Sequence, residues 1–129
     1  MDIIVTSLFV QDQDRALAFY TETLGFVKKH DIPLGEHRWI AVVASDKQDG
    51  TELLLEPNEH PAAKEYQDRI FADGIPATMF GVADIQQAFK RLSDNGVRFT
   101  MEPTVMGENA IAVFDDTCGN LIQIIQFNV

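Results

Sequence analysis

Apolar and polar residues alternate along eight stretches of the chain. This alternation predicts eight β-strands, because successive side chains of a strand point to opposite faces. The stretches are rich in β-branched and aromatic residues and are bounded by residues typical of turns. They cover residues 3–10, 26–30, 38–44, 52–56, 77–82, 97–101, 110–114 and 121–127. We expect a loop at Pro33-Leu34-Gly35, between the second strand and the third.

Three further stretches repeat apolar residues at the spacing of an α-helix. The first begins after Asp12 and ends at Gly25, and the third begins after Asp84 and ends at Gly96. An aspartate before a helix is a common N-cap, and a glycine after it a common stop. The second helix is expected at 60–73. Its buried side is predicted to consist of Ala62, Tyr66, Ile70 and Phe71.

The order of these elements occurs twice. Asp12 matches Asp84 at an offset of 72 residues, and Gly25 matches Gly96 at an offset of 71. A repeat of this length predicts two copies of one structural unit. The sequence therefore predicts an α+β fold, a single domain of residues 1–129 built from two tandem βαβββ modules. The modules are expected at 1–57 and 75–129, with a helical linker at 58–74.

Charge and composition exclude several classes of partner. The chain has 129 residues, with 20 acidic and 10 basic side chains and a formal net charge of −10. An acidic surface repels phosphate groups, so we expect no binding to nucleic acid or to anionic membranes. No apolar run is long enough to span a membrane, and the single cysteine, Cys118, excludes an internal disulfide. We therefore expect a cytoplasmic protein.

Two motifs connect the chain to a known family. Residues 10–26 resemble the opening V-x-D-x-x-x-A-x-x-F-Y-x-x-x-L-G-F of the vicinal oxygen chelate superfamily, and residues 116–123 resemble its ending D-P-x-G-N-x-x-E. That superfamily contains glyoxalase I, bleomycin-resistance proteins, fosfomycin-resistance enzymes and extradiol dioxygenases. The resemblance implies curved mixed sheets that form a cavity, with helices outside. It also implies a homodimer, which fits the need to cover the edges of two sheets.

The same resemblance argues against the metal chemistry of that superfamily. It places the metal ligands of the metal-dependent members at Val5, Leu54, Ala77 and Gln123. Three of these side chains have no donor atom, and one neutral amide cannot hold a divalent cation. We therefore expect no metal and no other cofactor. A register slip of two residues would bring Glu52 or Glu56 toward the site instead.

The favoured hypothesis is a protein that binds a small, largely apolar molecule in a metal-free cavity. In this interpretation Gln123 orients the ligand, because its strand neighbours are apolar. Trp39 is interpreted as either a flat wall for an aromatic ligand or an ordinary core residue. The predicted lining is Val5, Ser7, Phe9, Trp39, Leu54, Ala77, Met79 and Gln123.

The alternative is an enzyme of the same superfamily. It would be a lactoylglutathione lyase-like lyase or isomerase, or a dioxygenase, with a non-standard metal site or metal-free acid-base catalysis. His37 and Glu56 are the candidate catalytic residues, because a histidine and a carboxylate can exchange protons near neutral pH. Cys118 has no histidine near it in sequence, so we interpret it as a turn residue. The pairs Asp12/Asp14 and Asp115/Asp116 are interpreted as capping and turn residues.

Overall fold

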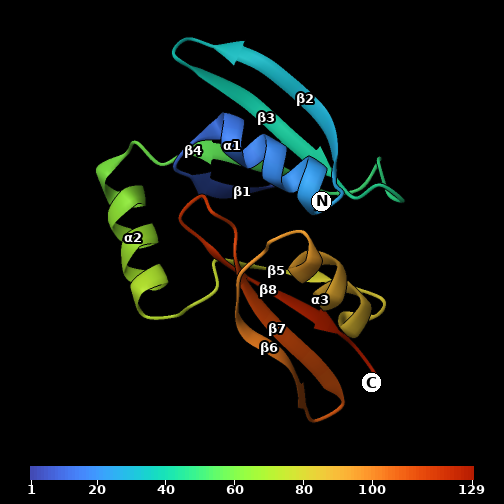
Figure 1. The fold of residues 1–129 in the computed structure, drawn as a ribbon. Coiled ribbons are helices and arrows are strands. Elements are labelled where there is room, and N and C mark those ends of the chain that lie inside the picture. Colours follow the sequence, from blue (N-terminus) through green and yellow to red (C-terminus); the bar gives the residue numbers. More distant parts are fainter. The chain divides into compact units, whose positions relative to one another are not determined.

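The computed structural model describes residues 1–129 and contains eight β-strands and three α-helices (Figure 1). They form two compact units, 1–65 and 66–129. Unit 1 contains β1 (Val5–Val10), α1 (Gln13–Ala18), a π-helical turn η1 (Phe19–Thr23), β2 (Val27–Leu34), β3 (His37–Val43) and β4 (Glu52–Pro57). The helix α2 (Pro61–Ala72) begins in unit 1 and ends in unit 2. Unit 2 continues with β5 (Thr78–Gly81), α3 (Ile85–Asp94), β6 (Phe99–Met106), β7 (Asn109–Asp115) and β8 (Leu121–Gln126).

Each unit has one four-stranded mixed sheet, with the order β1-β4-β3-β2 in unit 1 and β5-β8-β7-β6 in unit 2. The first and last strands of each unit are parallel neighbours, and the other pairs are antiparallel. The predicted α+β fold of two tandem βαβββ modules is thus confirmed. The proposed bounds of 1–57, 58–74 and 75–129 stay a prediction. None of the three helices has the length and apolar character needed to cross a bilayer.

In unit 1, alternation gives the sheet two different faces. One face is almost inaccessible and packs with α1, which contributes the buried Ala16, while Tyr20 of η1 is also buried. Burying each large apolar side chain of this kind contributes about 1.5–3 kcal/mol to folding. The sheet residues of this face are Leu8, Val10, Ile40, Val42, Leu53 and Leu55. We call the face of each sheet that does not pack with α1 or α3 its helix-free face.

In unit 2, α3 covers the corresponding face of the second sheet. Asp84 caps the helix, because its side chain accepts a hydrogen bond from the backbone N–H of Gln87. Phe89 of α3 packs edge-on against Phe99, with the ring centroids 4.8 Å apart, and Phe99 contacts Phe114 in the same way at 5.5 Å. Asp12 caps α1 as Asp84 caps α3. The predicted capping role of Asp12 is therefore confirmed, whereas Asp14 lies in the first turn of α1 and does not cap it.

The two hairpins are longer than the sequence predicts. The expected loop at Pro33-Leu34-Gly35 is wrong, since β2 continues to Leu34 and only Gly35-Glu36 form the turn. The second hairpin has the same turn, Gly107-Glu108, so β6 continues to Met106 instead of ending at 101. Both glycines have positive φ, 59° and 63°, and the glutamates do not, which is the type II′ pattern of tight hairpins. Pro33 is tolerated because β2 is an edge strand.

The buried side of α2 also differs from the prediction. Ala62, Tyr66 and Phe71 are exposed, and Ala63 and Gln67 are buried instead. Gln67 occupies an apolar position because its amide is satisfied: Nε2 donates to the carbonyl of Cys118 at 3.3 Å and to Oδ1 of Asn120 at 3.0 Å. A buried amide with such partners avoids the cost of an unpaired polar group. A count of apolar residues alone could not reveal this.

Candidate functional site

The predicted site residues of unit 1 lie on one face of its sheet. The register places Val5 beside Glu52, Ser7 beside Leu54 and Phe9 beside Glu56, all on the helix-free face. On β3, Ala41 pairs with Leu54, so alternation brings Trp39 and His37 to the same face. Trp39 is 37% exposed, so it is not an ordinary core residue. The part these residues play in ligand binding stays a prediction.

In unit 2, the helix-free face carries the predicted residues Ala77, Met79 and Gln123. Gln123 of β8 lies between Met79 of β5 on one side and Val113 of β7 on the other. The amide Nε2 of Gln123 donates to the sulfur of Met79 at 3.3 Å. A thioether is a weak acceptor, so this contact does not satisfy the amide. Gln123 is half-buried and keeps a carbonyl oxygen with which it can accept a hydrogen bond from a ligand.

The four positions at which the resemblance implies metal ligands do not fit a divalent cation. Leu54 is buried between Ser7 and Ala41, and Ala77 continues the β5–β8 ladder by donating its N–H to the carbonyl of Leu121 at 2.8 Å. Val5, Leu54 and Ala77 offer only hydrocarbon, and Gln123 only a neutral amide. Divalent cations need several carboxylate, imidazole or thiolate donors.

The two carboxylates of the slipped register lie on the same face of unit 1. Glu52 has two nitrogen-bearing neighbours: the Lys29 ammonium Nζ lies 3.5 Å from Oε2, and His30 Nε2 lies 3.7 Å from Oε1. Glu52 is therefore already balanced within the sheet. Glu56, a candidate catalytic residue, is half-buried opposite Phe9. The partner of His37 is Glu59, and no hydrogen bond or ion pair links His37 to Glu56. The structure therefore does not bring the two candidate catalytic residues together.

His37 instead belongs to a cluster that the sequence did not predict. Its Nε2 lies 2.9 Å from Oε2 of Glu59, and Glu36 completes a group whose ligand atoms all lie within 4.8 Å of one another. One imidazole and two carboxylates are suitable donors for a divalent transition metal. The type II′ turn places Glu36 next to His37, but Glu59 follows β4, and no sequence pattern links it to the turn. We call these three residues the turn cluster.

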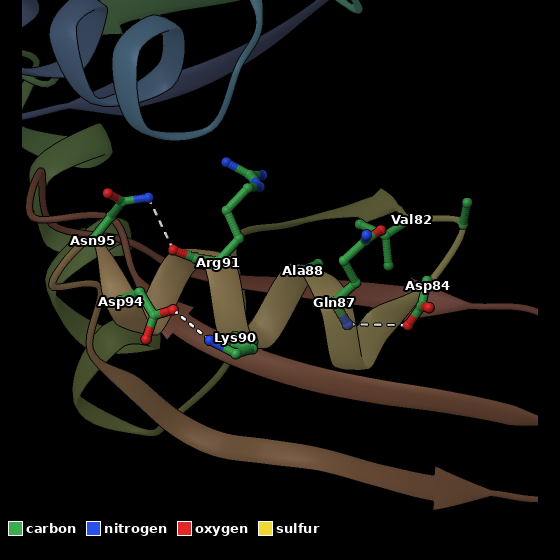
Figure 2. A pocket seen from close by; sticks show the side chains of 9 residues that line it. Val82, Asp84, Gln87, Ala88, Lys90, Arg91, Asp94 and Asn95 are labelled. Atoms are coloured by element: carbon green, nitrogen blue, oxygen red, sulfur yellow. Dashed lines mark hydrogen bonds and ion pairs between the residues drawn. The ribbon is translucent and has the colours of Figure 1, made fainter.

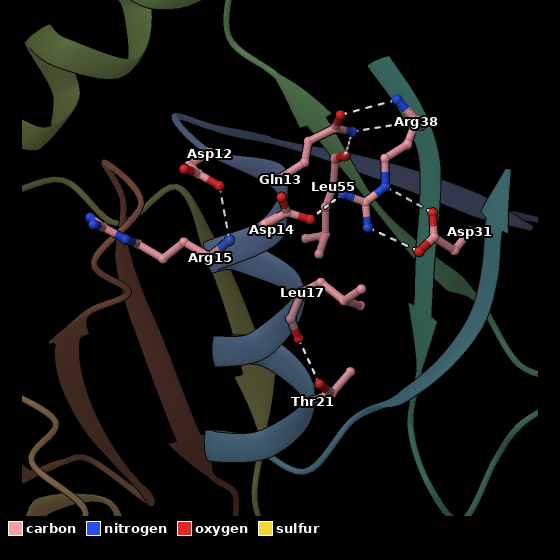
Figure 3. Close-up of polar contacts among 9 residues, drawn as sticks. All are labelled: Asp12, Gln13, Asp14, Arg15, Leu17, Thr21, Asp31, Arg38 and Leu55. Atoms are coloured by element: carbon pink, nitrogen blue, oxygen red, sulfur yellow. Dashed lines mark hydrogen bonds and ion pairs between the residues drawn. The ribbon is translucent and has the colours of Figure 1, made fainter. Parts of the chain in front are cut away.

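A second polar network ties α1 to the hairpin of unit 1 (Figure 3). Arg38 forms a fork with Asp31, with Nε–Oδ1 and Nη2–Oδ2 distances of 3.0 Å, and also pairs with Asp14. The hydrogen bond from Arg38 lowers the pKa of Asp31, and the two carboxylates raise the pKa of Arg38. Gln13 donates to the carbonyls of Arg38 at 2.6 Å and Leu55 at 2.9 Å. This network is structural, because its polar groups satisfy one another.

The turn between β7 and β8 is built around a buried carboxylate. Asp116 accepts hydrogen bonds from the N–H groups of Cys118 at 2.7 Å and Asn120 at 3.0 Å, and from the side chain of Asn120 at 2.8 Å. Asp115 accepts from the N–H of Thr117 at 2.7 Å. The predicted turn roles of both aspartates are confirmed. Cys118 is 0% exposed, which keeps its thiol away from a substrate in solution.

Two hollows occur in unit 2. The larger, of about 800 Å³, is an open groove over α3 (Figure 2). Its polar residues bond within the helix: Lys90 pairs with Asp94 at 2.8 Å, and Asn95 donates to the carbonyl of Arg91 at 2.9 Å. This is the pattern of a solvated helix surface. The smaller hollow, of about 400 Å³, lies on the helix-free face and includes Val113, the neighbour of Gln123.

Comparisons with known proteins agree with the fold. The family model described as Glyoxalase/Bleomycin resistance protein/Dioxygenase superfamily matches residues 2–124. The uncharacterised protein YurT of Bacillus subtilis is 72% identical over 126 residues, covering 98% of this chain and 99% of that protein. A probable lactoylglutathione lyase of Synechocystis sp. is 29% identical over 130 residues, with coverages of 98% and 95%. The crystal structure of TnmS3, an antibiotic binding protein from Streptomyces sp. CB03234, gives a TM-score of 0.78 at 26% identity, with coverages of 98% and 96%.

Proposed function

The chain belongs to the Glyoxalase/Bleomycin resistance protein/Dioxygenase superfamily, and on that premise we propose that it binds a small, largely apolar molecule without transforming it. The main support for this proposal is the chemistry of the four positions at which the resemblance implies metal ligands. Val5, Leu54 and Ala77 have no donor atom, and Gln123 has only an amide. The chain has the fold of the superfamily, but at these four positions it lacks the donor atoms with which the metal-dependent members bind their metal. A cytoplasmic setting, in keeping with the single Cys118, is part of the proposal.

Each helix-free face, taken by itself, offers surface that suits a largely apolar ligand. Phe9, Trp39 and Leu54 supply aromatic and aliphatic surface in unit 1, and Met79 supplies a polarisable thioether in unit 2. Gln123 offers one amide to fix the orientation of the bound molecule. Apolar sites with a few placed polar groups are typical of small-molecule binding. The likeness to an antibiotic binding protein supports the proposal that this chain is a binding protein.

The experiment is a thermal-shift screen with aromatic compounds that are neutral or carry one acidic group, including antibiotics, followed by mass spectrometry of the recovered ligand. A ligand that binds only the folded state stabilises it by about 2.7 kcal/mol at a concentration 100 times its Kd. We expect at least one compound to raise the melting temperature and to be recovered unchanged. Failure of every compound to bind, or its conversion with turnover, would overturn the proposal.

The turn cluster favours a second candidate function, catalysis assisted by a metal or by an acid-base pair. His37 is 2.9 Å from Glu59, so a carboxylate orients an imidazole beside a second carboxylate, Glu36. The likeness to a probable lactoylglutathione lyase supports this alternative. Metal analysis of protein purified without chelator separates the two. A stoichiometric metal that disappears in His37→Gln, together with product formation, would favour the enzyme.

A further inference from the structure

We propose that the smaller hollow of unit 2 is an anion subsite in which Arg98 binds the single acidic group of an otherwise apolar ligand. The inference rests on the proposed function, because it names the chemical class of the bound molecule. That class is an aromatic or aliphatic body with one carboxylate, sulfonate or comparable oxygen anion. Val113 lines the hollow, and Gln123 is its partner on the neighbouring strand β8. Gln123 therefore lies beside this subsite.

The floor of the hollow is the helix-free face where β6, β7 and β8 meet. Val113 and Asp115 of β7 lie next to Met101 of β6 and Leu121 of β8, and all four line the hollow. The end of α2 forms its wall through Phe71. The floor and wall therefore offer thioether, aliphatic and aromatic surface. Apolar surface of this kind gains by covering the body of a ligand.

An irregularity in β6 aims the polar groups into the same hollow. The register shifts between Phe99, which pairs with Phe114, and Met101, which pairs with Val113. An extra residue in one strand re-aims the side chains around it. Phe99 points toward α3, where it contacts Phe89, so alternation places Arg98 on the helix-free face. Arg98 and Thr100 both line the hollow.

The guanidinium of Arg98 differs from that of Arg38 in having no carboxylate partner. Arg38 is saturated by Asp31 and Asp14. Arg98 makes no ion pair, although Asp115 lines the same hollow and the two are joined through the backbone, where the N–H of Asp115 donates to the carbonyl of Arg98 at 3.0 Å. A guanidinium has five N–H donors suited to an oxygen anion. In a chain of net charge −10, an exposed arginine without an ion-pair partner, at a hollow that also has apolar lining residues, fits an incoming acid.

Asp115 limits the charge that the subsite accepts. Its Oδ1 accepts the N–H of Thr117 at 2.7 Å, which holds the carboxylate at the edge of the hollow. A second negative group on the ligand would approach this carboxylate and be repelled. The hollow therefore selects a monoanion over a dianion.

The test uses two fluorescent probes that differ in one charged group. One is 8-anilinonaphthalene-1-sulfonate, an aromatic monoanion, and the other is N-phenyl-1-naphthylamine, the same ring system without the sulfonate. Both are titrated into the full-length protein and into Arg98→Gln. The control is Arg91→Gln, which removes the same charge from the groove over α3. Circular dichroism and thermal melts establish that each variant is folded.

We expect the wild type to bind the sulfonate more tightly than the neutral probe. Arg98→Gln should weaken sulfonate binding about tenfold, as loss of a charged hydrogen bond does, and leave the neutral probe unchanged. Arg91→Gln should bind both probes as the wild type does. In the wild type, sulfonate affinity should also fall as salt rises from about 10 mM to about 1 M. This last measurement keeps the test decisive if Arg98→Gln does not fold.

Three results would overturn the subsite. They are unchanged sulfonate binding in Arg98→Gln, an equal loss in Arg91→Gln, and sulfonate affinity that is independent of salt. In any of these cases, neutral-probe binding that is the same in all variants would leave the proposed function intact. Failure of the wild type to bind either probe would count against both proposals.

Discussion

Gln123 is flanked by Met79 and Val113 and has only a thioether as its side-chain partner. Replacing it with leucine should therefore leave the fold intact, because no strong acceptor loses its donor. Binding of a ligand found in the thermal-shift screen should weaken by about 1–3 kcal/mol, the usual cost of removing one buried hydrogen-bonding partner. Calorimetric titration measures this loss, with Gln86→Leu, the same substitution at an exposed position of α3, as the control. Unfolding of Gln123→Leu would show that the residue is structural.

Gln67 should behave in the opposite way. It is 2% exposed and donates to both Cys118 and Asn120, so Gln67→Leu strands two buried acceptors. We expect the free energy of unfolding to fall by about 1–3 kcal/mol. The matched control is Gln86→Leu, the same substitution at an exposed position of α3. Denaturant titration of both variants makes the comparison, and equal stability would show that the network contributes nothing.

Alternation was sufficient to place the candidate residues of each sheet on one face. It could not find the partners that lie far away in sequence. Glu59 approaches His37 only because β4 returns the chain to the β2–β3 turn, and Gln67 is buried only because the turn after β7 supplies acceptors. Arg98 gives no functional signal in the sequence, since a single arginine in the predicted strand 97–101 is ordinary until its surroundings are known. Side-chain chemistry of this kind depends on tertiary contacts that periodicity does not contain.

The hairpin β2–β3 is joined to α1 through Arg38, and the pKa of Asp31 reports on this joint. The hydrogen bond from Arg38 lowers the pKa of Asp31 below its ordinary value of 3.8. A lowered folded-state pKa means stability that is fully present above the unfolded-state pKa and is lost as pH falls through the folded-state value. We therefore expect Asp31→Asn to flatten the acid side of the stability curve below about pH 4. Denaturation midpoints measured between about pH 2 and pH 7 test this.

Arg38→Lys is the matched change on the cationic side. Lysine keeps the charge but cannot form the fork to both oxygens of Asp31. We expect the stability of Arg38→Lys to change with pH on the acid side as the stability of Asp31→Asn does, and not as that of the wild type does. An acid limb identical to the wild type in both variants would show that the joint does not contribute to stability.

The elements themselves were predicted well where the pattern is strong and poorly at their ends. All eight strands and all three helices occur near their predicted places. The first hairpin is longer than predicted because the sequence pattern predicts a loop at Pro33, whereas an edge strand tolerates this residue. The repeat of Gly-Glu at 35–36 and 107–108 was visible in the sequence and would have fixed both turns.

Each sheet ends on two strands with unpaired edges, β1 and β2 in unit 1 and β5 and β6 in unit 2. The edge hairpin of unit 1 also exposes apolar side chains on its helix-free face: Ile32 is 50% and Leu34 57% exposed. Exposed edges and apolar patches favour association. We predict a homodimer, with the mass of two 14.4 kDa chains in light scattering at micromolar concentration. A monomer would contradict this, and Leu34→Lys should weaken the dimer if β2 lies in its interface.

β8 is the last strand of unit 2 in sequence but lies between β5 and β7, and β4 has the same position in unit 1. During synthesis on the ribosome, unit 1 therefore obtains its central strand early, while β5 stays unpaired until residues 121–126 emerge. We expect arrested nascent chains that lack β8 to protect a fragment near residues 1–65 from protease, and protection of nothing before β8 emerges would contradict this. The order in which the strands are synthesised thus determines how long each unit exposes unpaired strand edges to neighbouring chains in the cell.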